Sequence, residues 1–191
     1  MTAHLAYEGL HVQAGGNLHD HTTAVFDRDP ASPRSATYRY VYSCRWSTTL
    51  PSLQWWCHNP STATALHPDM TVTKIHGFTR RAGVYGGFDL LNRYALRSTD
   101  PELLDTYPFP VGPRNDEILA AFAGRPAPIV AAWGAIPCDP DRARQVHDLL
   151  AAAGATVLCL GTTDKGHPRH PSRLPYTTKF EPYKIPKAAS T

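Results

Sequence analysis

Four short apolar runs, each closed by a turn-forming segment, constrain the fold of this 191-residue chain more than any other feature. A short apolar run of about four to six residues predicts a strand that is buried on both faces, as in parallel sheets covered by helices. We therefore expect a covered parallel sheet built from Leu53–Cys57, Phe88–Leu91, Pro128–Trp133 and Thr156–Leu160.

Helical patterns separate these runs. Asp69 is a predicted N-cap, Gly83 a predicted C-cap, and the apolar side chains between them recur at spacings of three and four. Further helices are predicted after Asp100-Pro101, over 113–122, and from Asp139-Pro140 to Gly154. Strands that alternate with amphipathic helices predict a three-layer α/β/α sandwich with a four-stranded parallel central sheet.

Two more strands precede this region. Ala24–Phe26 and 37–46 are predicted to form an N-terminal β-hairpin, and the alternation over 38–42 indicates one solvent-exposed and one packed face. Residues 1–23 lack periodicity and are interpreted as a flexible arm, 24–181 as a single domain, and 182–191 as a basic tail.

Composition is typical of a globular chain, with 42% hydrophobic and 18% charged residues. No apolar run approaches the roughly 20 residues that span a bilayer, and no signal peptide is evident, so we expect a cytoplasmic protein without a membrane partner. The four cysteines have no C-x-x-C spacing and are interpreted as reduced thiols. A net charge of +3 is compatible with a polyanionic partner but does not require one.

Right-handed crossovers bring the carboxyl ends of parallel strands to one edge of a sheet, where ligands bind. Polar side chains from four separate segments are therefore expected to converge there. They are Asn59, Ser61 and Thr62; Asn92 and Arg93; Trp133; and His167, Arg169, His170 and Ser172. Ordinary turns and solvent-facing loops remain the alternative interpretation of each segment taken alone.

Two of these residues suggest a chemistry. The carboxamide of Asn92 offers donors beside an acceptor, which suits the edge of a nucleobase. His170 lies between prolines in a stiff loop that could direct its imidazole at charge developing on a leaving group. Four arginines, Arg93, Arg97, Arg169 and Arg173, are candidates for binding phosphate, with solvated surface charge as the alternative.

Other chemistries find less support. Cys57 and His58 are adjacent on a strand, so their side chains point to opposite faces and do not form a nucleophile–base pair. His167 and His170 lack a third metal ligand at recognisable spacing, so no metal site is predicted. There is no P-loop or dinucleotide-binding fingerprint, and no cofactor is expected.

Several separated motifs resemble those of the bacterial and phage family called domain of unknown function 1643. The resemblance extends from about Ala24 to Phe180. It is carried by Asn59–Ala63, Asn92–Arg97, Val111–Asp116, Trp133-Gly134 and Gly166–Pro171. That family implies no activity.

The order of elements is also similar to that of the uracil-DNA glycosylase superfamily. His58-Asn59-Pro60 resembles its turn with a water-positioning Asn, Leu90-Leu91-Asn92 its base-reading strand, and His170-Pro171-Ser172 the loop whose His stabilises the departing base. This resemblance implies N-glycosidic bond hydrolysis, with Asn59 and His170 as catalytic residues. Binding of the base would involve Ser61, Thr62, Asn92, Ser172, and Tyr94 or Trp133 as the stacking aromatic.

The expected partner is a nucleobase-containing small molecule or a nucleic acid, and no protein partner is implied. A non-catalytic nucleotide or nucleic-acid binding module is the competing hypothesis. A third is a small-molecule enzyme, acting on a free nucleoside or a secondary metabolite, which the modest charge favours over tight DNA binding.

Overall fold

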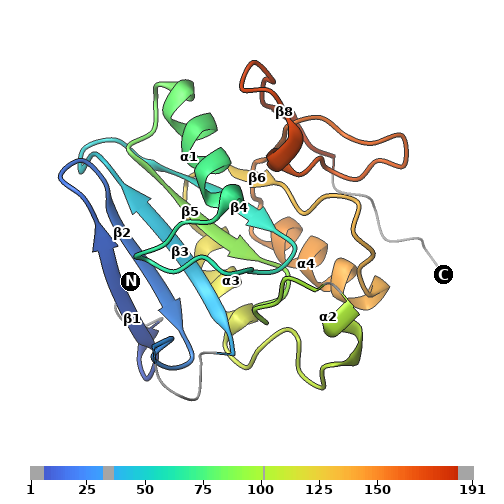
Figure 1. Cartoon of the computed structure of the whole chain (residues 1–191). Helices are drawn as coiled ribbons and strands as arrows, with labels where there is room; N and C mark the ends of the chain where they lie inside the picture. Colours follow the sequence, from blue (N-terminus) through green and yellow to red (C-terminus); the bar gives the residue numbers. More distant parts are fainter. Residues whose placement is uncertain (1–6, 32–36, 101, 185–191) are drawn as a thin grey trace.

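The computed structural model describes residues 7–31, 37–100 and 102–184, which form one eight-stranded mixed sheet with helices on both faces (Figure 1). The strand order is β1-β2-β3-β5-β4-β6-β7-β8. The strands are β1 (His11–Gly16), β2 (His21–Phe26), β3 (Arg39–Arg45), β4 (Ser52–Cys57), β5 (Gly87–Asn92), β6 (Ile129–Ala131), β7 (Val157–Cys159) and β8 (Glu181–Pro182).

The prediction of a four-stranded parallel central sheet is wrong. β5, β4, β6 and β7 pair in parallel, but four of the seven strand pairs are antiparallel: β1–β2, β2–β3, β3–β5 and β7–β8. β3 pairs directly with β5, Tyr42 opposite Leu90, so the N-terminal strands extend the same sheet. Apolar runs identify buried strands but do not indicate which neighbour each strand pairs with.

The described part of the predicted arm, residues 7–23, contains β1 and the start of β2, and the expected boundary at residue 24 falls inside β2. The glycines of this segment allow close packing, because a Cβ on Gly15 would lie 2.4 Å from the Ala65 carbonyl oxygen. Thr22 donates a hydrogen bond to the same oxygen at 2.6 Å. At the other end, residues 182–184 of the predicted tail are described, whereas 1–6 and 185–191 lie outside the described residues.

Helices α1 (Met70–Ala82) and α4 (Pro140–Ala152) begin where the sequence predicts, whereas the helix predicted from residue 113 begins at Asn115. Asp69 accepts a hydrogen bond from the Val72 N–H at the start of α1, and Gly83 ends it with a φ of 74°. Asp139 caps α4 through the Arg142 N–H. Between them lie α2 (Glu102–Thr106) and α3 (Asn115–Ala123).

Each face of the sheet carries its own apolar cluster. On one face, Ile75 and Phe78 of α1 pack with Trp55 of β4. On the other, α3 and α4 cover Trp56 and Leu91. This packing fixes the strand ends and the loops that follow them. Within the described residues, no helix is both long and apolar enough to cross a bilayer.

Candidate functional site

A small polar pocket lies where β4 and β5 end, beside the N-terminus of α1. Its volume is about 70 Å³. The pocket brings together Asn59 and Ser61 after β4, Asn92 at the end of β5, and His170 from the C-terminal loop. These predicted site residues therefore share one cavity. The remaining lining residues are Arg39, Cys57, His58, Asp69, Thr71, Leu90 and Ile136.

Asn92 is 1% exposed, and its Nδ2 has no hydrogen-bond partner among the described residues. Its backbone carbonyl is satisfied, because it accepts from the Asn115 side chain at 3.1 Å. An unpartnered buried donor costs about 1–3 kcal/mol. In a pocket, such a donor indicates a ligand that supplies the missing acceptor.

The Asn59 side chain is oriented by backbone carbonyls. Its Nδ2 donates to Ser98 at 2.9 Å and to Pro60 at 3.2 Å. Both donations use the amide nitrogen, so the carboxamide oxygen is the group that Asn59 can offer to a ligand or a water molecule.

His170 is the N-cap of the 3₁₀ helix η2 (Pro171–Arg173), where its Nδ1 accepts from the Ser172 N–H at 3.4 Å. This hydrogen bond assigns the proton of the neutral ring to Nε2. Burial lowers the pKa of His170, an effect partly opposed by the carboxylate of Asp69. At neutral pH the imidazole is therefore an uncharged donor.

The loop after β6 passes close to His170. Gly134 has a φ of 72°, and a Cβ on it would lie 3.3 Å from the His170 Cβ. Glycine at this position thus permits both the left-handed backbone and the close approach.

Sequence reasoning missed Arg39. Its side chain is 2% exposed, one amino group donates to the Ala63 carbonyl at 3.0 Å, and its Nε has no partner among the described residues. Burial lowers its pKa to about 10, against the attraction of Asp69. The prediction of a solvent-exposed face over 38–42 hid this residue, because β3 is buried on both faces along most of its length.

Asp69 and His58 also line the pocket, although the sequence did not identify them as site residues. Asp69 was identified only as a helix cap, although its half-buried carboxylate lines the pocket. The Nδ1 of His58 accepts from the Arg93 guanidinium at 2.7 Å. Burial, followed by the charge of Arg93, lowers the pKa of His58 to about 3, so this ring is neutral as well.

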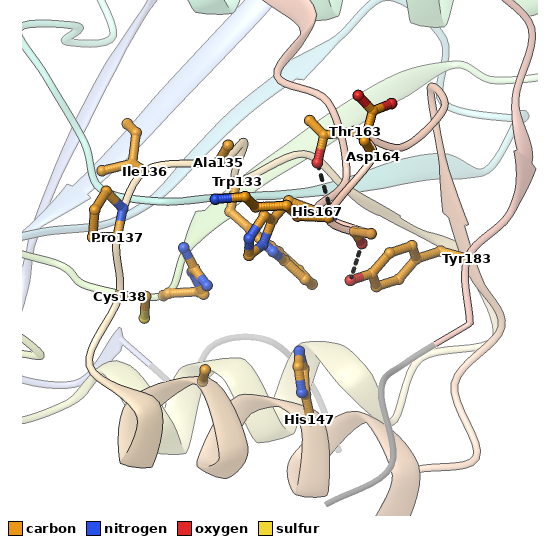
Figure 2. A pocket seen from close by; sticks show the side chains of 14 residues that line it. Trp133, Ala135, Ile136, Pro137, Cys138, His147, Thr163, Asp164, His167 and Tyr183 are labelled. Carbon is orange, nitrogen blue, oxygen red and sulfur yellow. Dashed lines mark hydrogen bonds between the residues drawn. The ribbon is translucent and has the colours of Figure 1, made fainter.

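A larger pocket of about 770 Å³ shares Ile136 with the small one. Figure 2 shows His147 projecting from α4 toward Trp133, with Tyr183 beside them. The Tyr183 ring lies edge-on to Trp133 at 5.7 Å between centroids, and its hydroxyl donates to the Gly166 carbonyl at 3.4 Å. Burial lowers the pKa of His147, and the charge of Arg93 acts in the same direction.

Other predicted site residues lie outside the small pocket. Trp133 and Arg93 line the larger pocket, where the guanidinium carbon is 5.1 Å from the Trp133 ring centroid. Tyr94 is buried, with its hydroxyl 3.4 Å from the Cys138 sulfur. Thr62 is exposed, and Ser172 contributes its backbone N–H to His170.

The remaining three predicted phosphate-binding arginines do not converge on either pocket. Arg97 packs over the Phe26 ring at 5.3 Å. Arg169 is exposed and donates to the Thr162 carbonyl at 3.2 Å, and Arg173 is exposed. The structure therefore assembles no phosphate cluster from these predicted residues.

One group of described residues has the composition of a metal site. Ligand atoms of Asp20, Cys44 and His76 lie within 4.8 Å of one another, and none of these residues lines the small pocket. The Arg80 guanidinium donates to the Asp20 carboxylate at 2.7 Å, so a cation already neutralises this carboxylate.

Residues 39–172 match the model of a family described as "Protein of unknown function (DUF1643)", and the chain belongs to that family. This result agrees with the resemblance noted in the sequence. No curated protein and no solved structure matches the chain. The resemblance to uracil-DNA glycosylases is therefore carried only by the short motifs.

Proposed function

We propose that the protein binds a nucleobase in the small pocket and hydrolyses an N-glycosidic bond. The observation that carries this proposal is the unpartnered Nδ2 of Asn92, buried in a pocket that also contains Asn59 and His170. Carboxamide and imidazole donors at the end of a strand are suited to the carbonyl edge of a base.

In this mechanism, the Asn59 carboxamide oxygen orients a water molecule and the Asp69 carboxylate accepts its proton. The water oxygen forms a bond to the anomeric carbon. The bond from that carbon to the base nitrogen breaks, and its electron pair stays on the base. His170 Nε2–H and Asn92 Nδ2–H then donate to the carbonyl oxygens of the base. One such oriented donor lowers the barrier by roughly 3–4 kcal/mol.

A free nucleoside or a related small molecule is the favoured substrate, rather than a nucleic acid. Arg97, Arg169 and Arg173 line neither pocket, and the net charge of +3 is small for a surface that binds a phosphate backbone. The small pocket, at about 70 Å³, holds only part of a base. The larger pocket, which shares Ile136 with it, has a volume of about 770 Å³, within the roughly 300–1,000 Å³ of typical ligand sites.

The test is to incubate the protein with free nucleosides and, separately, with DNA containing uracil or modified bases, and to quantify released base by chromatography. We expect release from a nucleoside, and no release by the folded Asn92→Ala variant. Binding without any release by the wild-type protein would instead support a non-catalytic binding module. Release from DNA alone would contradict the assignment of a free nucleoside.

A further inference from the structure

We propose that the small pocket selects a planar ring that is bound as an anion, and that Arg39 supplies the countercharge. This inference rests on the proposed function and adds to it the charge state of the preferred ligand. It also assigns a role to a residue on β3, a strand that contains none of Asn59, Asn92 and His170.

The fold leaves the hydrogen-bond donors of Arg39 only partly satisfied. A guanidinium carries five N–H donors, and the side chain of Arg39 is almost completely buried. One amino group donates to the Ala63 carbonyl, while the Nε donor has no partner among the described residues. The same residue lines the pocket, so a ligand in the pocket can meet the guanidinium.

Arg142, another buried arginine, has an ion pair that Arg39 lacks within the described part of the chain. Arg142 is 4% exposed, and its guanidinium forms an ion pair with Asp116 at 2.7 Å and donates to the Arg93 carbonyl at 2.7 Å. Arg39 has no carboxylate within 4.0 Å among the described residues. A buried charge without a partner is strongly unfavourable, so Arg39 requires a counterion.

Asp69 is the one carboxylate among the described residues that line the small pocket. One of its oxygens accepts from the Val72 N–H at 2.9 Å, at the positive end of α1. Its charge is therefore stabilised by the helix, and a ligand remains the direct counterion of Arg39. In the proposed reaction, the proton from water neutralises Asp69 while the base acquires negative charge, and this charge pairs with Arg39.

The chemistry of the remaining lining groups defines the ligand. Nδ2 of Asn92 and Nε2–H of His170 are donors, like Arg39, and the Asn59 oxygen is an acceptor. A set rich in donors suits the carbonyl oxygens of an ionised ring better than those of a neutral ring.

The experiment compares two pyrimidine rings of nearly equal size by calorimetric titration at neutral pH. Barbiturate is an anion under these conditions, and uracil is neutral. We expect the wild-type protein to bind barbiturate about ten- to a hundredfold more tightly, the range of a charge-assisted hydrogen bond. This comparison needs no variant, so it does not depend on how well Arg39 variants fold.

Two pocket variants give opposite expectations. Arg39→Gln should abolish the preference for barbiturate, whereas Asp69→Asn, which can still cap α1, should increase it by removing a repelling charge. Arg45→Gln is the matched control, because Arg45 lies on the same strand but is paired with Asp89 at 2.7 Å. It removes the same charge from the protein and should retain the preference.

The titrations distinguish failure of this inference from failure of the proposed function. Equal binding of both rings, unchanged in Arg39→Gln, overturns the role of Arg39 and leaves base recognition intact. Absence of binding by either ring overturns the proposed function and this inference together. Displacement of barbiturate by inorganic phosphate at constant ionic strength would identify an anion site of a different kind and overturn the preference for a ring.

Discussion

The two neighbouring pockets share Ile136 but differ in what their walls contribute to the molecule. Trp133 and Tyr183 of the larger pocket belong to the apolar cluster on one face of the sheet, where their rings contact each other. In the small pocket, Asn92 and Arg39 carry buried donors that the fold leaves unpartnered. Truncation of Trp133 or Tyr183 therefore tests folding, and substitution of Asn92 or Arg39 tests function.

The largest effect is expected for Trp133→Ala. Truncation of a buried tryptophan removes core contacts and should lower the free energy of unfolding by about 3–5 kcal/mol, as measured by chemical denaturation. Base release per folded molecule should change much less. A large loss of base release with unchanged stability would show instead that Trp133 is a ligand contact.

His170→Ala should reduce kcat for base release by about two to three orders of magnitude, because it removes an oriented donor. The control is His167→Ala, which changes an exposed residue of the same loop that lines only the larger pocket. It should retain kcat within a fewfold. Similar losses in both variants would remove the functional distinction between the pockets.

Stability should fall as the pH decreases from about 6.5 toward 3. His58 has a pKa of about 3 in the folded protein and about 6.5 when unfolded, so in this window the unfolded chain binds more protons. The slope attributable to this residue is at most about 1.4 kcal/mol per pH unit. The lowered pKa values of His147 and His170 act in the same direction.

The measurement is chemical denaturation over a series of pH values. His58→Asn, whose side-chain oxygen can replace the Nδ1 acceptor for Arg93, should flatten the slope. A slope identical to that of the wild-type protein would assign the acid sensitivity to other groups.

The smallest change in stability is expected for Asn92→Leu. Nδ2 of Asn92 makes no hydrogen bond with the described residues of the folded protein, so its removal leaves no acceptor unsatisfied. The free energy of unfolding should therefore stay within about 1 kcal/mol of the wild-type value or increase. Base release should be lost. The matched control is Asn115→Leu, which removes donations to two backbone carbonyls and should cost about 1–3 kcal/mol.

Local signals in the sequence identified most helices and strands. Asp69 and Asp139 mark helix starts in the structure, and the apolar runs lie on β4 to β7. The sheet itself could not be derived in this way. The Gly-rich pattern of β1 gave no strand signal, and the pairing of β3 with β5 depends on contacts between segments more than 40 residues apart.

The residues of the candidate site were likewise only partly predictable from the sequence. The rule that parallel strands end at one edge placed Asn59, Asn92 and His170 together, and they line one pocket. Arg39 was missed because it lies on a strand antiparallel to β5, to which that rule does not apply. Its signal was a charged residue within a run of apolar side chains, which becomes informative only when both faces of the strand are known to be covered.

Gly134 gives the loop after β6 a second influence on the small pocket, besides the Ile136 side chain that lines it. A Cβ at this position would press against the Cβ of His170 at 3.3 Å, besides straining the backbone. Gly134→Ala should therefore slow the reaction by displacing His170, with every polar group of the pocket still present.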